Sequence, residues 1–317
     1  MNGSELKAQP PVILLMGPTA SGKTALAVDW ASQFPVDLIS VDSALVYRGM
    51  NIGTAKPDPS TLERAPHQLI DIMDPTEPYS AAQFVADALM CIQRSHDSGR
   101  IPVLVGGTML YFKALIEGLS PLPAADPDVR ANIEQMLLSE GKEDVFARLV
   151  ECDPVTANRL KPSDTQRVQR ALEVFYISGR PMSDWHDQEV PSPLLGMAVK
   201  SAALLPNDRA VLHQRIAVRL GGMLSSGLVD EVRLLKTIPG LNLESSSMRA
   251  VGYRQVWDYL DGRFSYDEMV DKIAAATRQL AKRQLTWLRN WPHAYEKWVM
   301  DDQNLFELGR NFVKGLL

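Results

Sequence analysis

The residues with the clearest chemical potential form one short loop near the N-terminus of this 317-residue chain. The loop matches the phosphate-binding pattern G-x-x-x-x-G-K-[ST] at every fixed position. Its glycines allow backbone N–H groups to surround phosphate oxygens, and a following helix N-terminus adds partial positive charge. Lys23 would neutralise the outer phosphate, and Thr24 would hold Mg²⁺ through its hydroxyl. The loop predicts a diphosphate or triphosphate ligand and leaves the reaction open; its residues are Gly17, Pro18, Thr19, Ala20, Ser21, Gly22, Lys23 and Thr24.

Two further polar residues follow apolar runs and so belong to the same predicted sheet edge. Asp42 follows the run 37–41, where its carboxylate could accept a proton or contact a metal through water. It could equally form a local Asx turn. Thr108 follows Gly106-Gly107, and its hydroxyl could touch a bridging phosphate oxygen or cap the helix that begins at Met109. The residues alone leave both pairs of alternatives open.

Basic side chains gather at three places. Arg215 and Arg219 are four residues apart, so they share a helix face from which one could reach a phosphate, or they form a solvated stripe. The second group is Gln166 to Arg170. The third is a long predicted helix, in which Asp271 is the one acid between 271 and 290. Gln and Arg can read phosphates and base edges, although a charged run is often only a solvated face. The basic residues of the long helix are Lys272, Arg278, Lys282, Arg283 and Arg289.

The composition is that of a globular protein, with 45% hydrophobic and 22% charged residues. The net charge of −5 gives no overall sign of nucleic-acid binding, so basic groups must be judged locally. Cys91 and Cys152 lie far apart and make no metal or redox spacing, which favours a reducing compartment and a cytoplasmic protein. We expect no signal peptide, no membrane helix and no structural metal.

The elements that must position these residues alternate along the first part of the chain. Apolar runs at 12–16, 37–41, 69–72 and 101–105 are separated by helical patterns, which predicts a parallel sheet. Ligands of such sheets bind at the carboxyl ends of the strands. Strand character returns at 198–205 and at 295–299. Later helices are expected at 208–226, 228–237 and 247–260, and a helix capped by Ser265 and Glu268 at 265–290.

Proline-rich breakers at 121–127 and 191–193 enclose a stretch without strand patterns. Helices are predicted there at 127–139, 143–152 and 164–178, the last with a capping box of Ser163 and Gln166. We therefore predict an α/β fold, with a P-loop NTPase-like parallel sheet core flanked by helices. The catalytic core comprises 1–124 and 191–317, and 125–190 forms an all-helical insertion domain.

Two classes of function compete at this point, an enzyme acting on a phosphate and a nucleotide-dependent switch. A switch or ATPase normally places an acid at the end of a later strand to hold Mg²⁺. Here the run 101–105 ends in Gly-Gly-Thr, which weakens that interpretation. A small-molecule kinase that uses ATP, with Asp42 as its base, is the alternative enzyme.

Several uncommon motifs resemble those of the tRNA dimethylallyltransferase family. The similarity runs from about residue 10 to 300, and the motifs keep the order found in bacterial members. Besides the loop 17–24, they are Leu38 to Met50, Ile52 to Pro57, Pro66 to Asp71, Val105 to Tyr111 and Val251 to Gln255.

The resemblance implies transfer of a dimethylallyl group from dimethylallyl diphosphate to the exocyclic amine of an adenosine in tRNA. That adenosine lies 3′ of the anticodon in tRNAs that read codons beginning with U. The loop would then hold diphosphate, with Lys23, Arg219 and Mg²⁺ on Thr24 stabilising the leaving group. Asp42 would be the general base, and Thr108 would hydrogen-bond near the reacting atoms.

The resemblance also implies how the RNA is held. The target base would be flipped into a pocket, and the insertion would clamp the anticodon stem-loop. The long basic helix would add phosphate contacts. We expect a monomer that binds no membrane. The residues implied in tRNA binding are Asp42, Ser43, Ala44, Leu45, Thr108, Arg130, Gln166, Arg167, Val168, Gln169, Arg170, Ser247, Met248, Arg249, Ala250, Val251 and Gly252.

Overall fold

The computed structural model describes residues 10–188 and 190–317. The chain forms two compact units. The first contains the chain up to Ala114 together with Leu194–Leu317, and the second is Leu115–Pro193. The limits expected from the sequence, 125 and 190, lie inside the second unit.

The first unit is built on a six-stranded sheet with the order β3-β2-β4-β1-β5-β6, in which every neighbouring pair is parallel. This confirms the predicted parallel sheet. One strand lies earlier than expected: the run 69–72 was predicted, but β3 is His67–Gln68. Leu69 and Asp71 have φ values of 63° and 56°, which take the backbone out of the extended region. The other strands are β1 Val12–Met16, β2 Val36–Val41, β4 Ile101–Gly106, β5 Val199–Leu205 and β6 Glu296–Val299.

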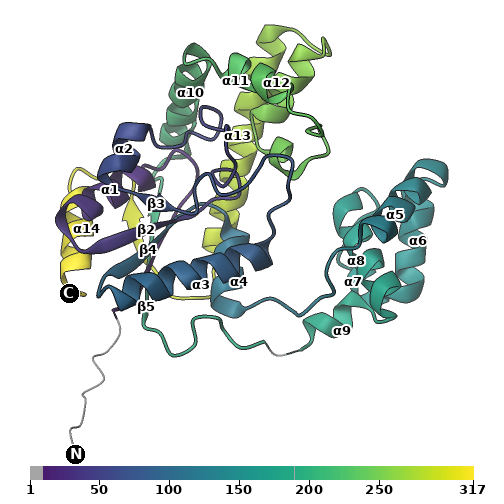
Figure 1. Cartoon of the computed structure of the whole chain (residues 1–317), viewed down its shortest axis with the longest axis horizontal. Coiled ribbons are helices and arrows are strands. Elements are labelled where there is room, and N and C mark those ends of the chain that lie inside the picture. Colours follow the sequence, from purple (N-terminus) through teal and green to yellow (C-terminus); the bar gives the residue numbers. More distant parts are fainter. Residues whose placement is uncertain (1–9, 189) are drawn as a thin grey trace, which may run out of the picture. The chain divides into compact units, whose positions relative to one another are not determined.

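Helices cover both faces of the sheet, which explains why β1 and β4 are buried along their whole length. Helix α3 packs on β2 and β4, and α1 packs beside α14 (Figure 1). The rings of Trp30 on α1, Trp298 on β6 and Phe312 on α14 meet in the core. The helices with residues in this unit are α1 Lys23–Gln33, α2 Pro59–Arg64, α3 Ala81–Asp97, α4 Met109–Glu117, α10 Arg209–Ser225, α11 Leu228–Leu235, α12 Tyr253–Leu260, α13 Tyr266–Arg289 and α14 Leu305–Lys314.

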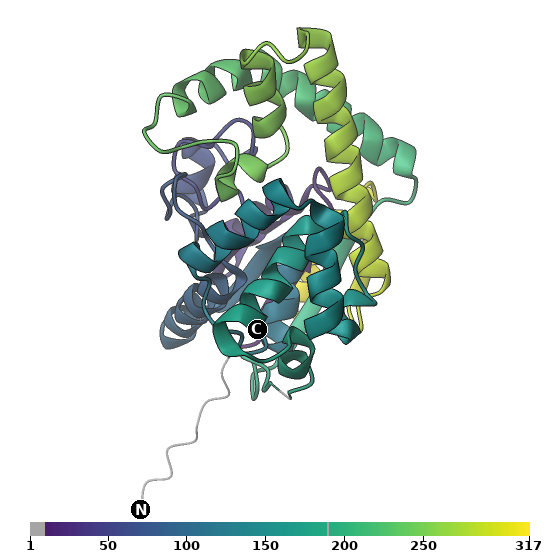
Figure 2. The ribbon, with the colours of Figure 1, turned by 90° about the vertical axis from the view of Figure 1, so that its right-hand side faces the viewer.

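Helix α13 runs unbroken over its whole length, as Figure 2 shows in yellow-green. Ser265 and Glu268 form the predicted capping box at its start. The single helix predicted over 247–260 is wrong. A 3₁₀ turn occupies Ser246–Arg249, and α12 starts only at Tyr253. Between them Ala250 is extended and Gly252 has a φ of 100°, so the chain leaves helical geometry there. Helix α14 was not anticipated.

The second unit is all-helical over its described residues. Its core contains Ile133, Leu149 and Leu172. The predicted capping box of Ser163 and Gln166 is wrong, because Asp164 is the N-cap residue and its carboxylate accepts a hydrogen bond from Arg167 instead. The helices are α5 Pro127–Ser139, α6 Lys142–Cys152, α7 Pro154–Ala157, α8 Thr165–Ser178 and α9 Met182–His186.

None of the helices in the described part of the chain has the length and apolar character needed to cross a membrane.

Candidate active site

The phosphate-binding loop joins β1 to α1, as its sequence context requires. Gly22 is the N-cap residue of α1 and has a φ of 94°, a conformation that favours glycine. No side chain caps the helix, so the first N–H groups of α1 point toward the space in front of the loop without an internal partner. A row of such N–H groups at a helix N-terminus is a general anion-binding arrangement.

Lys23 folds back over the loop. Its Nζ donates hydrogen bonds to the Pro18 carbonyl at 2.7 Å and to Ser21 Oγ at 3.3 Å. Desolvation by burial lowers the pKa of Lys23 to about 7; the charge of Asp42 opposes this shift and that of Arg219 adds to it. Asp42 thus compensates the cost of burying this ammonium only in part, and an anion in the loop would favour the charged form further.

Two arginines of α10 reach the loop from the side. Arg219 donates through Nη1 to Thr19 Oγ1 at 3.4 Å and through Nη2 to the Thr54 carbonyl at 3.2 Å. Arg215 donates to the Ser21 carbonyl at 3.4 Å and to the Met300 carbonyl at 3.3 Å. The pKa of Arg219 is lowered by burial, an effect that Asp42 opposes. Both side chains thus contact the site, and neither belongs to a purely solvated stripe.

Asp42 and Thr108 lie at the ends of neighbouring strands, β2 and β4. Asp42 Oδ1 accepts hydrogen bonds from the backbone N–H groups of Ala44 at 2.8 Å and Leu45 at 3.3 Å, which is an Asx turn. Thr108 Oγ1 accepts from the Ser43 N–H at 3.1 Å. The Asx turn occupies one oxygen of the half-buried carboxylate and fixes its direction, so the turn and a chemical role are compatible.

Two polar side chains that the sequence analysis did not single out hold the surrounding loops. Glu231 on α11 accepts hydrogen bonds from the N–H groups of three successive residues, 51–53, at 2.9, 2.7 and 3.1 Å, and from the Tyr253 hydroxyl at 2.7 Å. Gln284 on α13 bonds to the phosphate-binding loop and to Gly107. Gln284 is a polar residue on the buried stripe of α13, with Ile273, Ala281 and Leu288, and that position is the signal that could have identified it.

These elements enclose a cavity of about 940 Å³ within the first unit. Its walls bring together the loop residues 19–24, Asp42 to Leu45, Thr108 and Arg219. The backbone segment 249–252 also lines it. A group of apolar side chains adjoins these polar ones, so the cavity can accept a molecule with a charged end and an apolar or aromatic body; the group comprises Met109, Leu110, Leu220, Met223, Leu228, Ile273, Leu280 and Trp287.

The model of the IPP transferase family matches residues 45–291. This chain belongs to the IPP transferase family. The match begins after the phosphate-binding loop and Asp42, so the placement of those residues rests on the geometry above.

Solved structures agree with this family. The tRNA isopentenylpyrophosphate transferase of Bacillus halodurans is 34% identical, with 97% of each chain covered and a TM-score of 0.67. The tRNA delta(2)-isopentenylpyrophosphate transferase of Staphylococcus epidermidis is 29% identical, with 97% of this chain and 99% of that chain covered and a TM-score of 0.68. A eukaryotic dimethylallyltransferase described as acting on tRNA shares the fold at 24% identity, with 96% and 77% covered and a TM-score of 0.79. The kinase alternative is not supported by any of these similarities.

Some residues that family resemblance implied in RNA binding lie outside the cavity wall. Ser247 and Met248 are buried, and Ser247 Oγ donates to the Pro75 carbonyl at 2.5 Å. Arg249, Ala250, Val251 and Gly252 do line the cavity. Within the predicted stretch 247–252, Ser247 and Met248 therefore anchor the segment, and residues 249–252 line the cavity. Gly17 and Pro18 of the phosphate-binding loop are likewise not among the residues that line the cavity, and the Pro18 carbonyl accepts a hydrogen bond from Lys23 Nζ.

The predicted RNA-binding residues of the insertion are partly engaged inside their own unit. Arg130 and Arg170 pair with the fully buried Glu173, at 3.1 and 2.7 Å. Val168 belongs to the core, and Gln169 Nε2 donates to Glu134 at 3.0 Å. Gln166 and Arg167 are exposed on α8, and Arg167 is paired with Asp164 at 2.6 Å.

The oxygen atoms that could hold a divalent cation include the Thr24 hydroxyl at the start of α1 and the Asp42 carboxylate, both of which line the cavity. Among the described residues, no group of three or more His, Cys, Asp or Glu side chains is arranged so that it could hold a metal ion. Mg²⁺ typically takes one or two protein oxygens and completes its shell with substrate phosphates and water. The residues present fit Mg²⁺ carried on a diphosphate.

Proposed function

We propose that this protein transfers a dimethylallyl group from dimethylallyl diphosphate to the N6 amine of the adenosine 3′ to the anticodon, in tRNAs reading codons that begin with U, and releases diphosphate. Membership of the IPP transferase family supports the reaction class. The observation that carries the proposal is one cavity that is lined by the phosphate-binding loop, Asp42 and Thr108 together with apolar side chains.

The proposed reaction breaks one bond and forms another. The allylic C–O bond breaks with its electron pair leaving on diphosphate, and the adenosine N6 forms a bond to the allylic carbon. Negative charge grows on the departing oxygen, where Lys23, Arg219 and the N–H groups of α1 can stabilise it. Bound Mg²⁺ on Thr24 would add charge neutralisation at the diphosphate. The loop thus stabilises a leaving group and transfers no phosphoryl group.

Asp42 is the residue that we assign as general base. The attacking amine must lose one proton, and the carboxylate lines the same cavity as Thr108 and the loop. The Asx turn with Ala44 and Leu45 holds the carboxylate in one orientation, so it need not be ordered during the reaction. Thr108, fixed by its contact with Ser43, would hydrogen-bond near the reacting atoms.

The proposed acceptor is a base removed from its stack. An adenine inside an anticodon loop is reachable only when it is flipped out into a pocket, and apolar side chains such as Trp287 and Leu110 provide contact surface for it. Asp42 to Leu45 and 249–252 would line this pocket, and the insertion would clamp the stem-loop through its exposed polar residues. The enzyme would act where tRNA is used, in the cytoplasm, as a monomer.

Mass spectrometry of unmodified tRNA after incubation with the protein, dimethylallyl diphosphate and Mg²⁺ tests the proposal. We expect a mass gain of one dimethylallyl group on the nucleotide 3′ to the anticodon, and none with Asp42→Ala under the same conditions. The matched control Asp97→Ala, an exposed carboxylate at the end of α3, should behave as wild type. Phosphoryl transfer from ATP to a small acceptor, with no change in tRNA mass, would overturn the proposal.

A further inference from the structure

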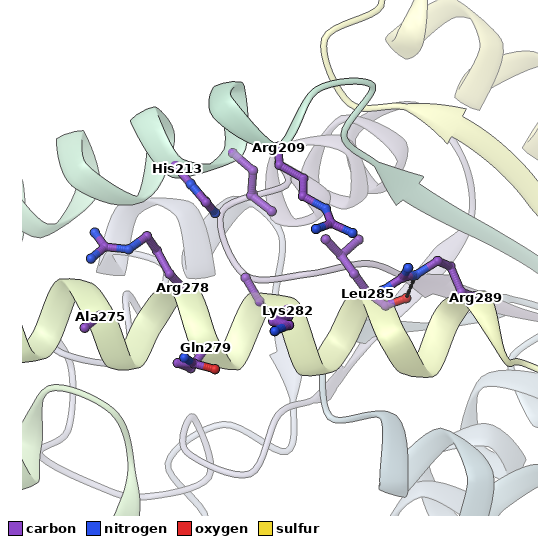
Figure 3. A pocket seen from close by; sticks show the side chains of 10 residues that line it. Arg209, His213, Ala275, Arg278, Gln279, Lys282, Leu285 and Arg289 are labelled. Carbon is purple, nitrogen blue, oxygen red and sulfur yellow. Dashed lines mark hydrogen bonds between the residues drawn. The ribbon is translucent and has the colours of Figure 1, made fainter.

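The basic side chains of α10 and α13 fall into two groups. One group lines a cleft of about 310 Å³ between the two helices (Figure 3), and it comprises Arg209, His213, Arg278, Lys282 and Arg289. The other group lines the catalytic cavity, and it comprises Arg215, Arg219 and Arg283. Within the second group, Arg219 donates both to Thr19 of the phosphate-binding loop and to the Thr54 carbonyl. The position of its guanidinium therefore depends on the loop that carries Thr54.

One carboxylate fixes the backbone that leads to Thr54. The three N–H groups of residues 51–53 all donate to Glu231 on α11, the first two to Oε2 and the third to Oε1. Thr54 follows directly, and its own hydroxyl donates to the Met50 carbonyl at 2.7 Å. Because three successive peptide N–H groups converge on one side chain, the direction in which the chain enters Thr54 is set by Glu231.

The residue after Thr54 has a backbone conformation that its surroundings must impose. Ala55 has a φ of 52°, in the left-handed region that a residue with a Cβ disfavours. Such conformations persist where surrounding contacts determine them, and they are common at functional sites. The Ala55 N–H donates to the Ile52 carbonyl at 2.9 Å, which closes the loop on the part that Glu231 holds. The peptide group with the Thr54 carbonyl joins Thr54 to Ala55, so relaxation of Ala55 would turn this carbonyl away from Arg219.

Tyr253, at the start of α12, packs against the same loop. Its side chain is fully buried, and its hydroxyl donates to Glu231 Oε1 at 2.7 Å. A Cβ on Gly53 would lie 2.5 Å from Tyr253 Cε2, so the ring approaches the backbone as closely as only glycine permits. Residues 249–252, which directly precede Tyr253, line the catalytic cavity. One hydroxyl–carboxylate hydrogen bond thus connects that part of the cavity wall to the loop 51–55.

We infer that Glu231 and Tyr253 are positioning residues, which set the place of the Arg219 guanidinium through the loop 51–55. The inference rests on the proposed function, in which Arg219 stabilises the departing diphosphate. Neither Glu231 nor Tyr253 is among the residues that line the cavity, so both act through Arg219. A donor to a developing anion is effective only where it is already aimed at the position of the charge. The hydrogen bond from Arg219 to the Thr54 carbonyl supplies that aim.

A double-mutant cycle with Arg219 separates this role from a general loss of stability. Tyr253→Phe keeps the buried ring and removes one of the four hydrogen bonds to Glu231. We expect kcat for prenyl transfer to fall by about 5- to 10-fold in the otherwise wild-type protein, because a small displacement of a reacting group is costly. When Arg219 is already glutamine, the same substitution should lower kcat by less than about twofold, since residues that act together are not additive.

Glu231→Gln is the stronger variant of the same cycle. It should lower kcat toward the roughly 10²-fold loss expected for Arg219→Gln itself, again with little further effect when Arg219 is absent. If this variant does not fold, Tyr253→Phe alone carries the test. The matched controls are Tyr266→Phe and Glu307→Gln, at exposed positions of α13 and α14, and they should leave kcat unchanged in both backgrounds.

Calorimetric titration with inorganic diphosphate gives a second readout, which does not depend on the reaction that follows. Tyr253→Phe should weaken diphosphate binding by about three- to tenfold in the wild-type background and should have no effect in Arg219→Gln. Equal losses of kcat and of diphosphate affinity in the two backgrounds would overturn the inference, as would wild-type values for both variants. If wild-type protein binds diphosphate but does not prenylate tRNA, the proposed function fails, and the binding cycle still decides whether Tyr253 acts through Arg219.

Discussion

The side chain of Gln284 on α13 joins the phosphate-binding loop to the end of β4. Its Oε1 accepts a hydrogen bond from the Thr19 N–H at 2.8 Å, and its Nε2 donates to the Gly107 carbonyl at 2.9 Å. A Cβ on Gly107 would lie 2.4 Å from Nε2, so only glycine permits this bridge. One buried amide therefore sets the separation of the loop that carries Lys23 from the turn that carries Thr108.

Gln284→Leu should impair the reaction more than the fold. The leucine keeps the volume but makes neither hydrogen bond, so the loop and Thr108 lose their fixed separation. A shift of about 1 Å between reacting groups can cost roughly 10²-fold in rate. We expect kcat to fall by about 10- to 100-fold in steady-state prenyl transfer, with folding monitored by circular dichroism. Gln93→Leu on the exposed side of α3 is the control, and an unchanged kcat for Gln284→Leu would refute the bridging role.

Asp42→Ala should lower turnover by about 10²- to 10⁴-fold, because the adenosine amine loses its proton acceptor. Since the substitution also removes the Asx turn, Asp42→Asn is the sharper variant: its side-chain oxygen can still accept from Ala44 while the base is lost. Both variants should retain tRNA binding in a filter assay. Full activity of Asp42→Asn would show that the carboxylate only forms the turn.

Binding of diphosphate should take up a proton at Lys23. The pKa of Lys23 is about 7 in the ligand-free protein because burial disfavours its charge, and a bound anion favours the charged form and raises the pKa. Below pH 7 the ammonium is already charged, so affinity is full there; it should fall as pH rises above 7 toward the pKa of the complex. Calorimetry in buffers of different ionisation enthalpy should report uptake of about one proton at pH 8.

The matching variant for this measurement is Lys23→Met. It should bind diphosphate weakly and show no proton uptake linked to this group. Equal uptake in wild type and Lys23→Met would place the titrating group elsewhere.

Arg219→Gln should reduce kcat by about 10²-fold, as removal of one donor to a developing anion commonly does. Its guanidinium touches Thr19 and Thr54 and is coupled electrostatically to Asp42 and Lys23. Arg233→Gln, which removes an exposed arginine of α11, is the control and should leave kcat unchanged. Retention of full activity in Arg219→Gln would remove it from the catalytic set.

Glu231→Gln should destabilise the protein, because the carboxylate accepts four hydrogen bonds and an amide cannot replace all of them. We expect a loss of about 2–4 kcal/mol in urea unfolding. Glu244→Gln, at an exposed carboxylate, should cost less than about 0.5 kcal/mol. Equal stability of the two variants would show that the contacts of Glu231 to 51–53 are energetically unimportant.

The parallel sheet and most helices could be predicted because the spacing of apolar residues, the capping residues and the glycines determine backbone conformation within a few residues of their own positions. The loop 17–24 carries its own geometry in its glycines, and Ser265 with Glu268 fixes the start of α13. The strand at 69–72 was misplaced because Leu69 and Asp71 have positive φ values; the Asp71 N–H donates to the carbonyl of Leu45, which lies outside the local sequence window. Such contacts leave no local pattern.

The residues of the candidate site also separate into those that the sequence predicts and those that it does not. Lys23 and Asp42 follow strands directly, so the sheet topology alone brings them to one edge. Glu231 and Gln284 bind backbone groups of loops that lie 177 to 265 residues away in the sequence, and no local pattern predicts those partners. The separation of the basic residues on α13 into two faces also needed the positions of α10 and of the loops around it.

The pairing of Glu173 with Arg130 and Arg170 affects how substitutions in the second unit must be interpreted. A carboxylate with no solvent exposure relies on both guanidinium groups and on the Asp126 N–H for its neutralisation. Replacing either arginine leaves this buried carboxylate with one guanidinium partner in place of two, so weaker tRNA retention by such a mutant would first report a loosened α5–α8 packing. The Arg167 side chain is 73% exposed, so its substitution is the better test of RNA contact by this unit.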